Sequence, residues 1–207
     1  MVDSVEAASY GHTASQPESE SYLYPHLLKL LRRIEARGPL FEIGAGAGWT
    51  ASSLTELGFQ VTGVEPSADG VALCRRNAPR ATIHMGSAYD DLAERYGRFP
   101  VVYSLEVIEH LYSPRLFVRA AYDLLEEGGH LILSTPYHGY WKNLALALTG
   151  KLDDHFTALW DHGHIKFWSE RTLRILLAEG GFEGFVFTHA GRRPPLSKSL
   201  FVVAVRR

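Results

Sequence analysis

The sequence has little of what marks secreted, membrane-spanning or nucleic-acid-binding proteins. Cys74 is the single cysteine of 207 residues, so no disulfide can form within the chain and a reducing compartment is expected. Lys plus Arg number 21 and Asp plus Glu 23, and this net charge of -2 gives no support for a nucleic-acid partner. The apolar runs are far shorter than the ~20 residues that span a bilayer. The first residues include Asp3 and Glu6 instead of a basic leader. We therefore expect a cytoplasmic protein without a transmembrane segment.

The composition, 46% hydrophobic and 21% charged, is that of an ordinary globular protein. At about 150 residues per domain, the length predicts one domain, over residues 21–207. The expected oligomeric state is a monomer or a homodimer. Residues 1–20 are polar and are expected to form a flexible arm.

Short β-rich runs alternate with stretches of helical periodicity, which predicts an α/β fold with a mostly parallel sheet and helices on both faces. A helix is expected over Tyr22–Ile34, ahead of the first strand. The expected strands are Leu40–Ile43, Val61–Glu65, Ala81–His84, Val101–Leu105, Leu131–Ser134, Phe185–His189 and Leu200–Val205. The further helices are Thr50–Leu57, Ala68–Asn77, Tyr89–Tyr96, Pro114–Leu125, closed by Gly128-Gly129, and Glu170–Ala178, closed by Gly180-Gly181.

Residues 136–168 interrupt this alternation with an insertion rich in aromatic residues and histidine. We expect a lid or pocket wall, because a disordered linker would not be so aromatic. Candidate contacts to a substrate are Tyr22, Tyr137, His138, Trp141, His155, Trp160 and His164, although ordinary packing explains any one of the aromatic residues equally well.

A glycine-rich turn, Gly44-Ala45-Gly46-Ala47-Gly48-Trp49, follows the first expected strand. At this place in a parallel sheet, free backbone N–H groups meet a ligand. The dinucleotide fingerprint has a third glycine where this chain has Trp49. Glu42, just before the turn, would repel a pyrophosphate but attract the cationic amino group of S-adenosylmethionine. Glu65, at the end of the second strand, can accept hydrogen bonds from both ribose hydroxyls in either cofactor class.

With these motifs, residues 22–207 resemble the class I S-adenosylmethionine-dependent methyltransferases, in their small-molecule branch. The resemblance rests on Glu42–Trp49, Val64–Ser67, Ser104–His110, Leu124–Gly129 and Gly180–Phe182. It implies a seven-stranded sheet with the last strand antiparallel and the cofactor over the carboxyl ends of strands one, two and four. The implied cofactor contacts are Glu42, Gly44, Ala45, Gly46, Trp49, Glu65, Pro66, Ser67, Ser87, Ala88, Leu105 and Glu106. Ser87 stands where the family commonly has an acid near the adenine.

The stretch Glu106-Val107-Ile108-Glu109-His110 is most similar to the quinone-biosynthesis O-methyltransferases, which act on catechol-type hydroxyls. The expected reaction is therefore transfer of a methyl group from S-adenosyl-L-methionine to an aromatic, quinone-type or secondary-metabolite hydroxyl, releasing S-adenosyl-L-homocysteine. His110 is the candidate general base, with packing under the lid as the alternative.

A metal ion is a second possibility at this stretch. If Glu106, Glu109 and His110 share a helix face, they can bind a divalent ion, although a solvated acidic helix start is favoured over this reading. His162-Gly163-His164 does not match a standard zinc spacing. Three rival functions stay open: N- or C-methylation of a small molecule, a nicotinamide-dependent oxidoreductase, and a cofactor-binding module without turnover.

Overall fold

The computed structural model describes residues 15–156, 158–161 and 163–207. In this part of the chain, seven strands form one sheet in the order β3-β2-β1-β4-β5-β7-β6. β7 runs antiparallel to β5 and β6, and the other neighbours are parallel. The strands are β1 (Leu40–Ile43), β2 (Val61–Glu65), β3 (Thr82–Met85), β4 (Phe99–Leu105), β5 (Leu125–Pro136), β6 (Phe182–Ala190) and β7 (Ser199–Arg206). The expected mostly parallel sheet with an antiparallel last strand is confirmed.

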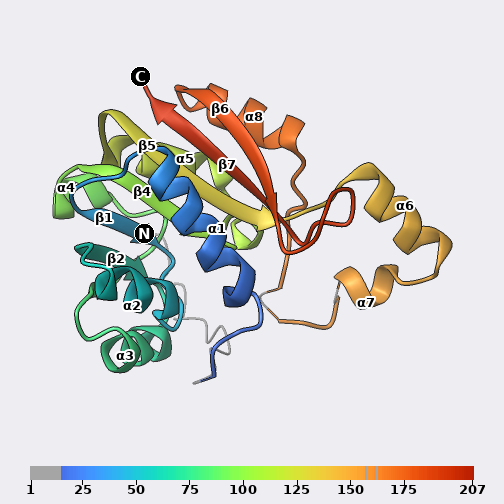
Figure 1. Cartoon of the computed structure of the whole chain (residues 1–207), viewed down its shortest axis with the longest axis horizontal. Helices are drawn as coiled ribbons and strands as arrows, with labels where there is room; N and C mark the ends of the chain where they lie inside the picture. Colours follow the sequence, from blue (N-terminus) through green and yellow to red (C-terminus); the bar gives the residue numbers. More distant parts are fainter. Residues whose placement is uncertain (1–14, 157, 162) are drawn as a thin grey trace, which may run out of the picture.

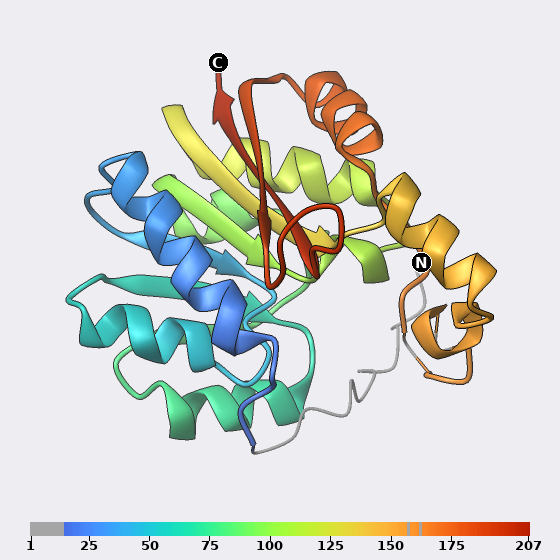
Figure 2. The same ribbon diagram turned by 45° about the vertical axis from the view of Figure 1, so that its right-hand side comes forward.

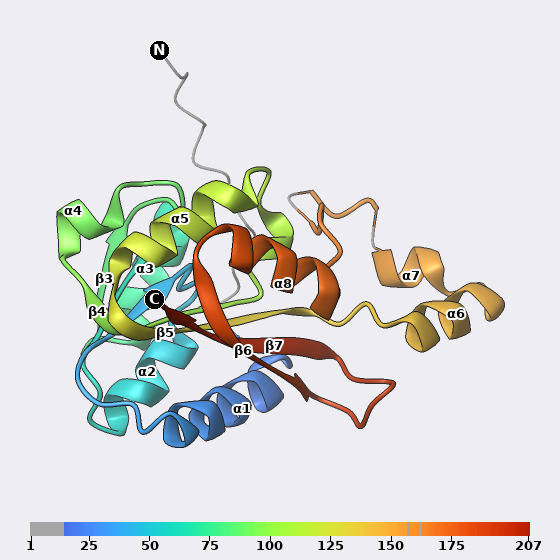
Figure 3. The ribbon, with the colours of Figure 1, turned by 90° about the horizontal axis from the view of Figure 1, so that it is seen from above.

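Helices cover both faces of the sheet (Figure 3). One face carries α1 (Glu20–Arg33), α2 (Trp49–Glu56) and α3 (Ala68–Asn77). The other carries α4 (Leu92–Tyr96), α5 (Pro114–Leu124) and α8 (Glu170–Glu179). Each face has its own apolar cluster, so the inner strands are buried on both sides, as parallel strands in α/β folds are.

Alternation along β1 decides which side chains face which helices. Leu40 belongs to the apolar cluster beneath α1 and α2, whereas Phe41 and Ile43 belong to the cluster beneath α5 and α8. Because successive side chains of a strand point to opposite faces, Glu42 lies on the α1 and α2 side. The acid before the glycine-rich turn is therefore buried under these two helices.

Several expected boundaries differ from the structure, and two of the differences have a clear physical reason. α5 ends at Leu124 and β5 begins at Leu125, so Gly128-Gly129 does not close the helix but lies within the strand. Gly128 has φ +74°, and the pairing of β4 with β5 shifts between Phe99 and Val101, so a local irregularity takes up the extra residues. α4 begins at Leu92, because the Asp91 side chain caps it at Glu94 N.

The segment between β5 and α8 contains α6 (Tyr140–Leu148) and α7 (Leu152–Phe156), which extend away from the sheet beyond the tip of β5 (Figures 1 and 2). Most of the expected arm, residues 1–14, lies outside the described residues, and the helix after it starts at Glu20 instead of Tyr22. Among the described helices, none is long and apolar enough to cross a membrane.

Candidate functional site

The glycine-rich turn between β1 and α2 has backbone conformations that favour glycine. Gly44, Gly46 and Gly48 all have positive φ. A Cβ on Gly44 would lie 2.5 Å from Cγ2 of Val107, so the loop after β4 approaches the turn too closely for any side chain at this position. Cys74 Sγ donates to the carbonyl oxygen of Gly46 at 3.2 Å and is buried.

The carboxylate of Glu65 holds the two loops that border the turn. Its Oε2 accepts a hydrogen bond from Gly46 N at 2.9 Å, and its Oε1 accepts one from Ser67 N at 3.0 Å. Ser67 Oγ in turn caps α3 at Gly70 N. Each carboxylate oxygen can accept a second hydrogen bond. Glu65 therefore shapes the turn from the end of β2, which is the position expected for a ribose-binding acid.

Glu42 is buried, with 3% of its surface exposed. Burial raises its pKa to about 8, and the negative charge of Glu20 adds to this increase. Within the described residues, its Oε2 has no hydrogen-bond partner. A buried carboxylate oxygen without a partner is costly unless a ligand completes it, so Glu42 Oε2 suits a cationic or hydrogen-bond-donating ligand.

The loop after β3 contains an acid that the sequence analysis missed. Asp90 Oδ2 accepts a hydrogen bond from Ser87 N at 3.1 Å and pairs with Arg95 at 3.3 Å. Ser87 Oγ accepts a hydrogen bond from Tyr89 N. The carboxylate thus organises this loop, and Ser87 and the buried Ala88 lie between β3 and α4. In the sequence, Asp90 lies only three residues after Ser87, the position where an acid was expected, and this short spacing could have identified it.

The loop after β4 does not form a helix that would place Glu106, Glu109 and His110 on one face. Residues Ile108–His110 form a single 3-10 turn, and Glu106 lies before it with φ +53°. Ser134 Oγ donates to Glu106 Oε1 at 2.7 Å and accepts from Glu106 N at 3.1 Å. Burial raises the pKa of Glu106 to about 7. Glu106, Glu109 and His110 therefore do not share a helix face, and the alternative of a metal site on these three residues has no geometric basis.

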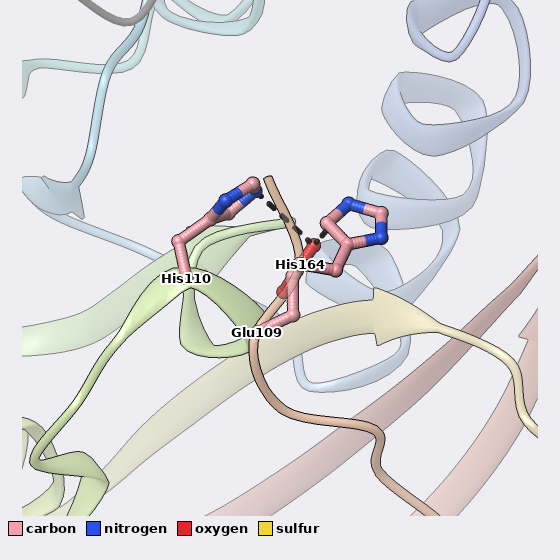
Figure 4. Close-up of side chains that lie close together, drawn as sticks. All are labelled: Glu109, His110 and His164. Carbon is pink, nitrogen blue, oxygen red and sulfur yellow. Dashed lines mark ion pairs between the residues drawn. The ribbon is translucent and has the colours of Figure 1, made fainter. Parts of the chain in front are cut away.

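A different group of three converges here: Glu109, His110 and His164 (Figure 4). Their candidate ligand atoms lie within 4.8 Å of one another, and Glu109 Oε1 is 4.0 Å from Nε2 of both histidines. Glu109 is fully buried and, in the described part of the chain, neither of its carboxylate oxygens accepts a hydrogen bond. Burial, followed by the charge of Glu106, raises its pKa well above the ordinary value.

These three residues fit a divalent metal ion. Burial lowers the pKa of His164 to about 4, so its imidazole is neutral near pH 7 and has a lone pair to offer. Two imidazoles and one carboxylate form a donor set used for first-row divalent ions. The backbone holds the group together, because Ile165 N and Lys166 N both donate to the Glu109 carbonyl oxygen at 2.9 Å. His162 lies outside the described residues.

Aromatic residues of the insertion surround this group. The Trp160 ring packs edge-on against His110 at 5.7 Å and against His164 at 5.3 Å. His110 Nδ1 lies 3.2 Å from the carbonyl oxygen of Gly163. A second ring cluster contains His138, His155, Phe156 and Phe167. Burial lowers the pKa of His138 to about 4. The insertion thus brings His138, His155, Trp160 and His164 to one side of the loop after β4.

Three other candidate contacts lie in different surroundings. Tyr137 packs against His189 at 4.7 Å, and the Tyr22 ring lies under Lys198 Nζ at 5.0 Å. Trp141 is 64% exposed and packs edge-on against its neighbour Tyr140. Trp141 is therefore not brought to the site.

Comparisons with known proteins identify the family of the chain. A family model described as a methyltransferase domain matches residues 17–185. A ubiquinone biosynthesis O-methyltransferase of Ruegeria pomeroyi is 31% identical over 157 residues, which is 72% of this chain and 63% of the relative. Another from Bradyrhizobium sp. (strain ORS 278) is 34% identical over 116 residues, 54% of this chain and 44% of the relative. The chain thus spans about half the length of these relatives.

Among solved structures, the magnesium protoporphyrin IX methyltransferase of Synechocystis PCC 6803 with bound S-adenosylhomocysteine is similar. Its TM-score is 0.65 at 20% identity, over 89% of this chain and 81% of that one. This likeness concerns the fold.

Proposed function

The chain belongs to the family of methyltransferase domains, and on that basis we propose that it transfers the methyl group of S-adenosyl-L-methionine to a small molecule, releasing S-adenosyl-L-homocysteine. The acceptor we propose is a hydroxyl on an aromatic, quinone-type ring. The relatives named as ubiquinone biosynthesis O-methyltransferases support oxygen as the acceptor atom over nitrogen or carbon.

The buried carboxyl group of Glu42 carries the choice of cofactor. It lies at the start of the glycine-rich turn without a hydrogen bond to Oε2 from any described residue. A diphosphate would bring negative charge to a carboxyl group that burial already keeps protonated, whereas the α-ammonium group of S-adenosylmethionine stabilises its ionised form. Glu65, Gly44, Ala45 and Gly46 then border the nucleoside side of the same turn.

Methyl transfer from a sulfonium is an in-line displacement, so most of the catalytic effect comes from alignment of the acceptor oxygen with the methyl group. His110 lies in the loop after β4, between Glu109 and Trp160. Its imidazole is the group we assign to removal of the acceptor proton. Trp160, His138 and His155 line the side from which the insertion approaches an aromatic acceptor.

We further assign Glu109, His110 and His164 as the residues that would hold a divalent ion. When bound there, such an ion lowers the pKa of an acceptor hydroxyl. In that case Glu109 would supply the negative charge and the two histidines would supply neutral imidazoles. His110 would then be a ligand, and its role as a base applies to the site without an ion. The low pKa of His164 favours this use of its ring over proton transfer near pH 7.

The near balance of charge and the single, buried Cys74 support a cytoplasmic enzyme that acts without nucleic acid, as a monomer or homodimer.

The test is a methylation assay of the purified protein with S-adenosylmethionine and a panel of aromatic acceptors that carry neighbouring hydroxyl groups. Mass spectrometry should find one added methyl group on oxygen, with S-adenosylhomocysteine formed in equal amount. Methyl groups found on nitrogen or carbon would correct the acceptor. Binding of the cofactor without product from any acceptor would indicate a binding module. Thermal stabilisation by NADH but not by S-adenosylhomocysteine would indicate an oxidoreductase.

A further inference from the structure

Glu20, the first residue of α1, reaches the beginning of α2. Thr50 Oγ1 donates to its carboxylate, 2.9 Å from Oε1 and 3.1 Å from Oε2. Thr50 is 4% exposed and lies one residue after the start of α2, directly behind the glycine-rich turn. A single hydroxyl proton cannot satisfy both carboxylate oxygens. Glu20 thus keeps acceptor capacity at the edge of the turn.

Glu20 and Glu42 approach this place from two elements that are far apart in the sequence. Glu42 faces the α1 and α2 side of the sheet, where its Oε2 is buried without a partner among the described residues. Burial raises the pKa of both carboxyl groups, and Glu20 adds to the increase at Glu42. In the described ranges, neither residue forms an ion pair with a lysine, arginine or histidine.

Ionising a second buried acid near the first costs free energy when no counter-ion is present, and the raised pKa of Glu42 reflects this cost. A ligand that brings a positive charge and several N–H donors removes this cost. A primary ammonium group has three donors and no acceptor, so it matches two carboxylates and the hydroxyl between α1 and α2. A sulfonium has no N–H donor and cannot make these hydrogen bonds.

We propose that Glu20 is a cofactor-binding residue which, together with Glu42, receives the α-ammonium group at the amino-acid end of the cofactor. This inference rests on the proposed function and adds to it a residue from α1. The start of α1 then acts as part of the cofactor site. It is tied to the sheet nearby, because Glu18 pairs with Lys198 in the loop before β7.

The experiment compares two nucleosides by titration calorimetry. S-adenosylhomocysteine has the amino-acid end, and 5′-methylthioadenosine has the same nucleoside thioether without it. Glu20→Gln keeps the shape of the side chain but removes its charge. We expect this variant to bind S-adenosylhomocysteine about tenfold more weakly, as fits the loss of a hydrogen bond to a charged group, and to bind 5′-methylthioadenosine with unchanged affinity.

Glu18→Gln is the matched control, because Glu18 is an exposed acid two residues away whose carboxylate faces Lys198. It should bind both nucleosides like the wild type. Circular dichroism checks that each variant is folded. If Glu20→Gln does not fold, Glu20→Asp, which keeps the charge but shortens the side chain, is expected to lose affinity for S-adenosylhomocysteine alone.

Three outcomes would overturn the role of Glu20: unchanged affinity of Glu20→Gln for S-adenosylhomocysteine, equal losses for both nucleosides, or equal affinity of the wild type for the two. Failure of the wild type to bind either nucleoside would contradict the proposed function itself. The two failures are therefore distinguishable.

Discussion

Glu109 and His164 lie side by side although they are far apart in the sequence, with Oε1 of the glutamate 4.0 Å from Nε2 of the histidine. The two amides that follow His164 both donate to the Glu109 carbonyl oxygen. The end of the insertion, residues 164–166, thus contacts the loop after β4 through both its backbone and a side chain. This attachment makes the insertion part of the site, even though α6 and α7 extend away from the sheet.

A divalent ion should bind this group. Titration with Co²⁺ should produce visible absorption bands of a nitrogen- and oxygen-ligated ion in the wild type, because two neutral imidazoles and a carboxylate are present. His164→Ala and Glu109→Gln should each weaken binding by about tenfold or more, since each removes one ligand. His84→Ala, at an exposed histidine on β3, is the control. Equal cobalt affinity in all four proteins would refute the site.

Glu42 should make the free protein less stable as the pH rises. The folded protein keeps the Glu42 proton up to about pH 8, whereas the unfolded chain has lost it above the ordinary value of 4.5. Because the folded state binds the extra proton, its free energy of unfolding falls between these values, by about 1.4 kcal/mol per pH unit for one group. Urea unfolding of wild type and Glu42→Gln should show a gap in favour of the variant that widens with pH across this window. A difference in the free energy of unfolding that does not change with pH would show that the pKa of Glu42 is not raised in the folded protein.

His110→Ala should lower turnover while affinity for S-adenosylhomocysteine stays nearly the same, because His110 lies beside Glu109 and Trp160 and not in the glycine-rich turn. A loss of about 100-fold fits removal of a general base. In the wild type, turnover should fall when acidification protonates this imidazole. A rate that does not change between about pH 6 and about pH 9 would remove this assignment.

Gly44→Ala should destabilise the protein more than Gly58→Ala. Both glycines have similar positive φ, +84° and +93°, so both variants incur the backbone cost of about 1–2 kcal/mol. The new Cβ at Gly44 also meets Val107 Cγ2 at 2.5 Å, whereas none of the described atoms lies within 4 Å of the one at Gly58. We expect a difference of roughly 1–3 kcal/mol in urea unfolding. Equal losses would mean that Val107 moves aside freely.

Most elements followed from periodicity because apolar spacing is a local property of the chain. β1, β2 and α3 begin and end where expected, and β7 extends only one residue further at each end. The largest error, at the start of β5, came from a long-range effect. β5 begins at Leu125 because it pairs with β4 across an irregularity, and no local pattern reports that partner.

The fold class, the glycine-rich turn and the two flanking acids Glu42 and Glu65 could be read from residue patterns, because spacing along neighbouring strands translates directly into position at one sheet edge. Which side chains meet depends on the folded chain. It directed Glu106 to Ser134, joined Glu109 and His110 to His164 from the insertion, and placed Glu20 beside Thr50. These contacts depend on the path of the chain between distant segments, which no local pattern of residues encodes.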